Sequence, residues 1–76
     1  MEYARAGRDA IGTVIRAERA RLGLSQEHVA HEARMSVRHY AKIEKGTENV
    51  TLKSLFEIAR VLKLDLRQLV EKAMQP

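Results

Sequence analysis

The sequence lacks several residues on which whole classes of protein depend. Its 76 residues include no cysteine and no tryptophan, two tyrosines, one phenylalanine, four glycines and a single proline. Without cysteine there can be no disulfide bond and no cysteine-ligated zinc site. The only proline is the last residue, Pro76, so no proline interrupts a helix. The glycines never form a loop that could cradle phosphate groups, which argues against an enzyme.

Long apolar runs are absent as well. No segment approaches the roughly 20 apolar residues that a membrane span requires. The N-terminus has no apolar stretch typical of a signal peptide. We therefore expect a cytoplasmic protein without a membrane partner. At this length we expect one domain over residues 1–76, with residues 1–8 as an N-terminal arm.

Candidate catalytic and metal-binding groups are few. No two acidic residues stand out as a general acid and base, and the serines have no neighbouring base motif. His28 and His31 have a spacing that two metal ligands can use, but no further ligand cluster accompanies them. We expect neither catalysis nor a cofactor or metal site.

Charge is distributed unevenly along the chain. Fourteen lysines and arginines against ten acidic residues give a net charge of +4. The stretch from Arg34 to Lys45 holds four of these bases and a single acid, Glu44, whereas residues 47–76 carry five bases and four acids. The concentration of positive charge predicts an anionic partner for the middle of the chain.

Apolar residues follow a helical period in five segments, and no segment alternates apolar and polar residues as a half-buried strand would. The first helix is expected to end at Gly23, because glycine readily adopts the left-handed conformation that terminates helices. Its buried face is expected to consist of Ile11, Val14, Ile15 and Leu22.

Each later helix is expected to begin after a residue whose side-chain oxygen can cap it. These caps are Ser25, Ser36, Thr51 and Asp65, the last with Gln68 as its capping-box partner. The expected inward positions are, in chain order, Val29, Ala30 and Ala33; Tyr40 and Ile43; Leu52, Leu55, Phe56, Ala59 and Leu62; and Leu66, Leu69, Val70 and Ala73. The pattern predicts a compact all-α domain of five helices.

The second and third helices are short, and the link Arg34-Met35-Ser36 between them does not allow antiparallel packing. They must therefore cross at a large angle. Small residues lie where the helices would press together, namely Ala30 and Ala33, and larger ones, Tyr40 and Ile43, would fill the space beneath. Such an arrangement is typical of a helix-turn-helix.

At these residues the sequence resembles the Cro and phage-repressor (Xre) family of helix-turn-helix proteins. The resemblance rests on Leu24-Ser25-Gln26-Glu27, Val29-Ala30, Ala33, Ser36 and Ile43-Glu44-Lys45-Gly46. It extends to the first helix through Ile15-Arg16 and Arg19, and to the last two through Leu52, Leu55, Ile58-Ala59, Leu62, Leu64, Leu66 and Leu69. It covers about residues 11 to 70, and it implies a λ-repressor-like fold whose third helix reads the major groove of DNA.

The resemblance also implies roles for individual residues. Those that would read base edges are Val37, Arg38 and Lys42. Those that would contact phosphates are Ser25, Gln26, Ser36, His39, Lys45 and Asn49. Their chemistry suits these roles, because arginine can donate two hydrogen bonds to guanine and an amide at a helix start can bind phosphate. Arg19 and Glu44 match a family pair that ties the first helix to the end of the third.

Three residues depart from the family pattern. Arg34, in the turn, and Lys63, after the fourth helix, stand where the family usually has glycine. A left-handed conformation at Arg34 would cost roughly 1 kcal/mol, unless the turn is built differently or Arg34 reaches a phosphate. Tyr40 replaces an aliphatic residue, so its hydroxyl needs a partner or a path to solvent.

Stand-alone members of this family usually act as twofold dimers on palindromic sites. We therefore expect a homodimer on double-stranded DNA, and the length and layout look most like the controller proteins of restriction–modification systems. RNA polymerase would be a further partner, and no small-molecule effector is expected. The expected dimer surface is formed by Leu64, Arg67, Val70 and Met74. Two other interpretations stay open: an antitoxin, and a protein-interaction module of the same fold.

Overall fold

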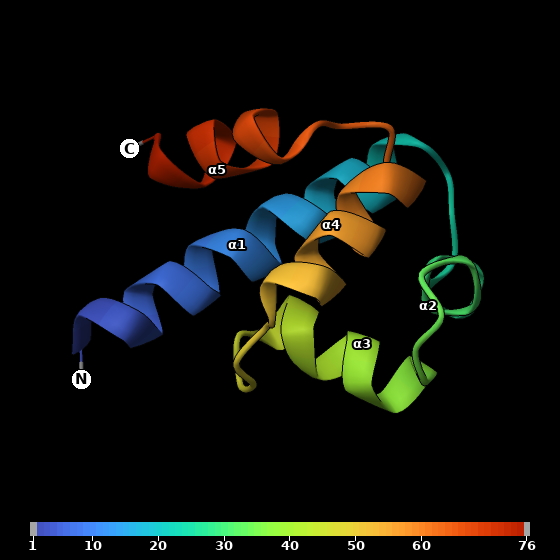
Figure 1. Ribbon diagram of the computed structural model, residues 1–76, viewed down its shortest axis with the longest axis horizontal. Coiled ribbons are helices and arrows are strands. Elements are labelled where there is room, and N and C mark those ends of the chain that lie inside the picture. The colour runs from blue at the N-terminus through green and yellow to red at the C-terminus, as the bar shows by residue number, and fades with distance from the viewer. Residues whose placement is uncertain (1, 76) are drawn as a thin grey trace.

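The structure, a computed structural model, describes the backbone of residues 2–75 and the side chains of residues 7–75. Five helices joined by short loops account for most of these residues (Figure 1). They are α1 (Glu2–Arg21), α2 (Gln26–Glu32), α3 (Val37–Lys45), α4 (Leu52–Val61) and α5 (Leu66–Met74). Residues 2–75 contain no strand, so the predicted all-α fold of five helices is confirmed.

The first helix is longer than the sequence pattern suggested. Residues 2–8, expected as a separate arm, form the first two turns of α1, and Met1 lies outside the described residues. Alanine, glutamate and arginine dominate this stretch and no proline interrupts it, so local propensity favours continuing the helix. None of the helices in residues 2–75 combines the length and apolar character needed to cross a bilayer.

All four expected caps form at the starts of α2 to α5. The side chains of Ser25, Ser36, Thr51 and Asp65 each accept a hydrogen bond from the backbone N–H three residues further on. At α5 the capping box is complete, because the Gln68 side chain accepts from the Asp65 N–H at 2.9 Å. These bonds satisfy donors that a helix start otherwise leaves without partners.

The first four helices also end alike, each in a residue with left-handed backbone geometry. Gly23, Arg34, Gly46 and Lys63 have φ values of 71°, 62°, 76° and 60°. Each donates its N–H to the carbonyl three residues back, and the next residue donates to the carbonyl five residues back. This pair of bonds is the Schellman motif. Arg34 and Lys63 stand where the family usually has glycine, and both nevertheless adopt the left-handed conformation.

Among residues 7–75, eleven apolar residues form the core: Ile15, Val29, Ala30, Ala33, Tyr40, Ile43, Leu55, Ile58, Ala59, Leu62 and Leu69. The prediction was wrong for three residues. Leu52 and Phe56 expose 63% and 53% of their surface, and Val70 exposes 38%. Leu52 and Phe56 lie at one edge of the apolar stripe of α4, whose centre alone faces the other helices.

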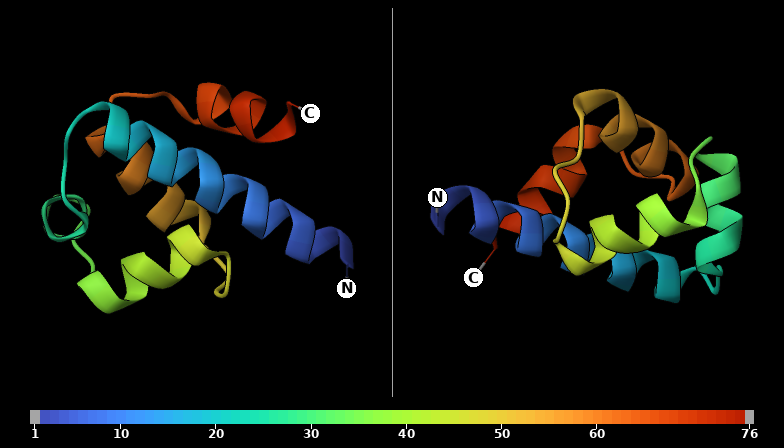
Figure 2. Two further views of the ribbon diagram at one scale, coloured as in Figure 1. Left: turned by 180° about the vertical axis from the view of Figure 1, so that it is seen from behind. Right: turned by 90° about the horizontal axis from the view of Figure 1, so that it is seen from below.

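The helix α1 is the element around which the others are arranged. It contacts both α3 and α5, and α5 lies along it in Figures 1 and 2. In Figure 1, α3 lies below both α1 and α4. The approach of α1 to α3 is close at Gly12, where a Cβ atom would lie 2.5 Å from the Glu44 carbonyl oxygen and 2.6 Å from that of Ile43.

Tyr40 is fully buried at the centre of this packing. Its hydroxyl oxygen makes no hydrogen bond with any described residue. Burial, together with the nearby carboxylate of Glu44, raises the pKa of Tyr40 far above its ordinary value. The phenol therefore stays neutral and acts as a core side chain.

Candidate nucleic-acid interface

The helices α2 and α3 form the crossing pair expected from the sequence. Ala30 of α2 and Ala33, the residue that caps the end of α2, are buried, and Tyr40 and Ile43 of α3 are buried beneath them. The turn is closed by the left-handed Arg34. Outside the pair, the Arg60 side chain of α4 donates a hydrogen bond of 2.7 Å to the Glu32 carbonyl at the end of α2. The crossing angle is therefore held by packing within the pair and by α4.

One face of α3 is turned away from the core, and we call α3 the recognition helix from here on. Val37 exposes 42% of its surface, and Arg38 and Lys45 are exposed. Lys42 and Ala41 are half-buried. The three residues predicted to read bases, Val37, Arg38 and Lys42, thus lie outside the core on a single short helix.

The acid in this stretch does not share that face. Glu44 is buried and points toward α1, where its carboxylate pairs with Arg19. The charge surplus inferred from the sequence is therefore larger at the surface than the residue count indicates. Arg38, Lys42 and Lys45 meet no carboxylate of their own helix on the outer side of the recognition helix.

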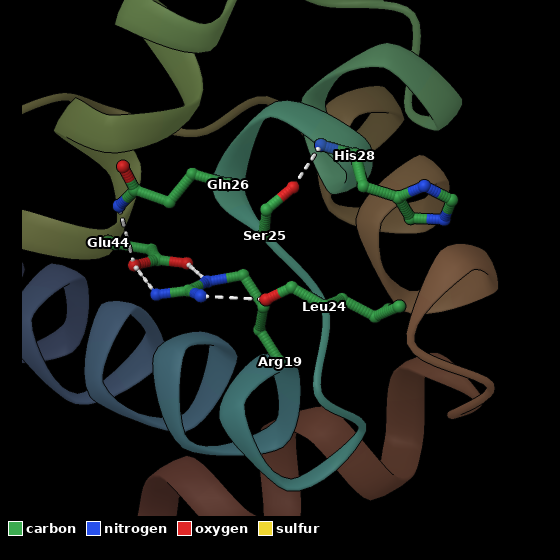
Figure 3. Close-up of polar contacts among 6 residues, drawn as sticks. All are labelled: Arg19, Leu24, Ser25, Gln26, His28 and Glu44. Atoms are coloured by element: carbon green, nitrogen blue, oxygen red, sulfur yellow. Dashed lines mark hydrogen bonds and ion pairs between the residues drawn. The ribbon is translucent and has the colours of Figure 1, made fainter.

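Arg19 and Glu44 belong to a network that joins α1, α2 and α3 (Figure 3). The Arg19 guanidinium donates to Glu44 Oε2 at 2.7 Å and to Oε1 at 3.2 Å, and it also donates to the Leu24 carbonyl at 2.9 Å. The side-chain amide of Gln26 donates to Glu44 Oε1 at 3.0 Å. One carboxylate thus holds a side chain from each of the other two helices.

The electrostatics of this network favour its charged form. Burial by itself would raise the pKa of Glu44, but hydrogen bonds, above all from Arg19 and also from Gln26, outweigh it and hold that pKa below its ordinary value. The hydrogen bond to Glu44 likewise raises the pKa of Arg19. Both groups are therefore ionised at neutral pH, and the pair carries no net charge.

The two serines predicted to bind phosphate act as helix caps. Ser25 Oγ accepts from the His28 N–H at 3.0 Å, and Ser36 Oγ accepts from the His39 N–H at 3.1 Å. A hydroxyl that accepts one hydrogen bond can still donate another. Both serines are exposed, so capping and a contact with phosphate are compatible.

Two further predicted phosphate contacts have partners within the protein. His39 Nδ1 pairs with the Glu48 carboxylate in the loop after the recognition helix. Asn49 Oδ1 accepts from the Arg8 guanidinium at 2.7 Å. Sequence reasoning missed Glu48 and Arg8, since nothing in the order of residues relates Arg8 to a loop 41 positions away.

The comparisons with known proteins agree with this geometry. The family model described as helix-turn-helix matches residues 15–69. The chain belongs to the helix-turn-helix family. The expected membership of the Xre type is thereby confirmed, and the matched range includes α2, the turn and the recognition helix. A comparison with curated protein sequences finds no match.

Several solved structures share the fold. The clp gene regulator ClgR from Corynebacterium glutamicum superposes with a TM-score of 0.86 at 24% identity, over 88% of this chain and 71% of that one. The restriction-modification controller C.AhdI from Aeromonas hydrophila gives 0.79 at 29% identity, over 82% and 94%. The competence regulator ComR from Streptococcus vestibularis gives 0.79 at 32% identity, over 86% of this chain but 22% of ComR.

These findings establish the broad function. The helix-turn-helix family and the regulators among its structural neighbours make this protein a DNA-binding transcriptional regulator. Regulators of this family act by binding rather than by catalysis.

Proposed function

We propose that this helix-turn-helix protein binds a palindromic DNA operator as a homodimer and regulates its own operon, as a restriction–modification controller does. The observation that carries the proposal is the outer face of the recognition helix, where Val37, Arg38 and Lys42 lie while Glu44, the one acid of that helix, is buried and paired with Arg19 of α1. A helix of this kind enters the major groove with its N-terminal residues against base edges.

The base contacts follow from the chemistry of these side chains. Arg38 can donate two hydrogen bonds to O6 and N7 of a guanine, and Lys42 can reach the same acceptors. Val37, at the first position of the recognition helix, suits the methyl group of a thymine. Lys42 is half-buried, so its side chain is less free to extend toward the bases than the exposed side chain of Arg38.

Phosphate contacts would flank these base contacts and set the register of the protein on DNA. Gln26 and Ser25 lie at the start of α2, where backbone N–H groups are free to bind an anion. Ser36 and Lys45 lie at the two ends of the recognition helix, and both are exposed. His39 and Asn49 would have to exchange or share their protein partners to contact DNA.

One module reads only a few base pairs, which is too little to select a site in a genome. A homodimer would place two recognition helices in successive major grooves, about 34 Å apart. Phe56 and Leu52 expose more than half of their surface on α4, and aromatic side chains are enriched in interfaces. We therefore assign the dimer surface to this pair, with Leu64 and Arg67 beyond the end of α4.

The remaining residues of the dimer surface expected from the sequence, Val70 and Met74, are exposed on α5. They define the alternative surface. Leu64, by contrast, is half-buried and packs against the core. It could contribute only its outer edge to a dimer.

The comparison with C.AhdI supports the controller role, because this chain matches 94% of its length. A protein of that type would act in the cytoplasm through its own concentration, without a small-molecule effector, and RNA polymerase would be its partner at the promoter. An antitoxin or a protein-interaction module would have the same fold but a protein as its main partner.

The decisive experiment is selection of bound duplexes from a random DNA pool at near-physiological salt, followed by sequencing. Enrichment of a palindrome with half-sites about one helical turn apart would support the proposal. Binding that selects no sequence and disappears as salt rises would reflect attraction to the phosphate backbone alone. That result would overturn the proposal in favour of a protein partner.

A further inference from the structure

The side chain of Gln26 is held in place before any DNA arrives. We propose that Glu44 is a positioning residue for DNA binding: it fixes the amide of Gln26 in the orientation that contacts a phosphate, while Arg19 neutralises its charge. The proposal rests on the proposed function in one respect only, namely that Gln26 contacts the DNA backbone.

The orientation of the amide follows from donor and acceptor chemistry. An ionised carboxylate can only accept hydrogen bonds, so the nitrogen of the Gln26 amide, and not its oxygen, must face Glu44. That nitrogen donates to Glu44 Oε1 at 3.0 Å. It carries two hydrogens, and the second remains available for a phosphate oxygen. In Figure 3 the amide oxygen of Gln26 points away from Glu44.

The charge of Glu44 would disfavour a nearby phosphate if it were not compensated. The Arg19 guanidinium binds both carboxylate oxygens, at 2.7 and 3.2 Å. The side chain of Glu44 is almost entirely buried, with 3% of its surface exposed. The carboxylate can therefore hold Gln26 without presenting a net negative charge to DNA. Arg19 is itself fixed by its bond to the Leu24 carbonyl, just before the start of α2.

Holding one side chain in advance has a predictable effect on affinity. A free glutamine at a protein surface loses rotational freedom when it binds a phosphate, and this loss corresponds to roughly two- to tenfold in affinity. Glu44 would remove that cost because Gln26 is already ordered. The part of its effect on DNA binding that comes from holding Gln26 must therefore vanish when Gln26 is absent, whereas the effect of its charge remains.

The first test compares Gln26→Ala, Glu44→Met and the double variant on the operator duplex selected above, with folded protein confirmed by circular dichroism. Gln26→Ala should weaken binding about tenfold when Glu44 is present, the size of one hydrogen bond to a charged group. In the Glu44→Met background, the loss of affinity caused by Gln26→Ala should be roughly two- to tenfold smaller. Loss of the Glu44 charge changes attraction to DNA equally with and without Gln26, so it cancels in the cycle.

If Glu44 only supported the fold, Gln26→Ala would weaken DNA binding equally with and without Glu44. That result would overturn the proposal. Glu18→Met is the matched control. Glu18, on α1, also has a nearly buried carboxylate. It pairs with Arg21 and Lys72 rather than with the recognition helix. Its loss should leave the effect of Gln26→Ala unchanged.

The second test needs neither DNA nor a variant, so it separates this proposal from the proposed function. Nitrogen-15 relaxation of the side-chain amides should show Gln26 as rigid as the capping-box residue Gln68. Gln75, exposed at the end of α5, is the mobile reference. A Gln26 amide as mobile as that of Gln75 would overturn the proposal even if Glu44→Met failed to fold.

Discussion

Gly12 of α1 lies directly against the backbone of Glu44 at the end of the recognition helix. A Cβ atom at Gly12 would lie 2.5 Å from the Glu44 carbonyl oxygen, closer than real contacts allow. The helix that carries Val37, Arg38 and Lys42, the side chains proposed to read bases, thus contacts α1 through two backbones that lie directly against each other. Any side chain at position 12 would push the recognition helix away from its support.

Gly12→Ala is therefore expected to destabilise the protein by about 1–3 kcal/mol, because overpacking against backbone outweighs the higher helix propensity of alanine. The measurement is the free energy of unfolding in urea. Gly7→Ala, on the same helix, is the control, since a Cβ atom there meets nothing within 4 Å. It should stabilise the protein by up to about 1 kcal/mol. Similar effects of the two variants would contradict the close seating of α3.

Lys63→Gly is expected to stabilise the protein. Lys63 has a φ of 60°, which costs a residue with a side chain about 1 kcal/mol. Glycine has more freedom in the unfolded chain, which offsets part of this gain. We expect a net gain of about 0.5 kcal/mol and a rise of a few degrees in the melting temperature. Gly23→Ala should lower the melting temperature, because Gly23 is left-handed and has open space around it, so only the backbone strain changes. A lower melting temperature for Lys63→Gly would show that its side chain contributes to the fold.

Acid should weaken the link between α1 and the recognition helix. The pKa of Glu44 is lower in the folded protein than its ordinary value, so its stabilising effect is present above about pH 4.3 and is lost as the pH falls through the folded pKa. Glu44→Gln resembles the protonated state, and it should cost roughly 3 kcal/mol at pH 7. That difference from the wild type should shrink below about pH 4. The loss in Ile58→Val, which removes no charge, should stay constant with pH. A difference for Glu44→Gln that did not shrink would exclude the ionised pair as its source.

Arg38→Ala should change sequence preference, whereas Lys45→Ala should change affinity. If Arg38 contacts a guanine, its loss costs about 1–3 kcal/mol at one base pair and relaxes the preference there. If Lys45 contacts a phosphate, Lys45→Ala should weaken binding to all sequences alike. It should also reduce the slope of log K against log salt by about 1. Fluorescence anisotropy on single-base variants of the operator distinguishes the two effects. Uniform weakening by Arg38→Ala would assign Arg38 to the backbone instead.

Phe56→Glu should dissociate the proposed homodimer. Phe56 exposes 53% of its surface on α4, and a charge there would have to be buried without a partner in the dimer. Sedimentation at tens of micromolar should show a dimer for the wild type and a monomer for Phe56→Glu. Met74→Glu, on the alternative surface of α5, should remain dimeric. The reverse result would place the dimer contact on α5, and a monomeric wild type would exclude the dimer.

The local elements of this protein were predictable from its sequence because they depend on residues close in the chain. Capping side chains and terminating residues act over three to five positions, so the starts of α2 to α5 and the stops at Gly23 and Gly46 follow from residue type. The outward face of the recognition helix follows from its period of 3.6 residues. The sequence also indicated that Arg34 would need a left-handed conformation if the turn followed the family pattern, and Arg34 adopts that conformation.

The tertiary structure decided which apolar faces are covered, and it brought together polar groups that the sequence did not relate to each other. Periodicity indicates an apolar stripe on α4, but only its packing against α2 and α5 shows that Leu55 and Leu62 are buried while Leu52 and Phe56 are not. The bond from Gln26 to Glu44 joins residues 18 positions apart. Such contacts depend on how three helices pack together, and no local preference of either residue encodes them.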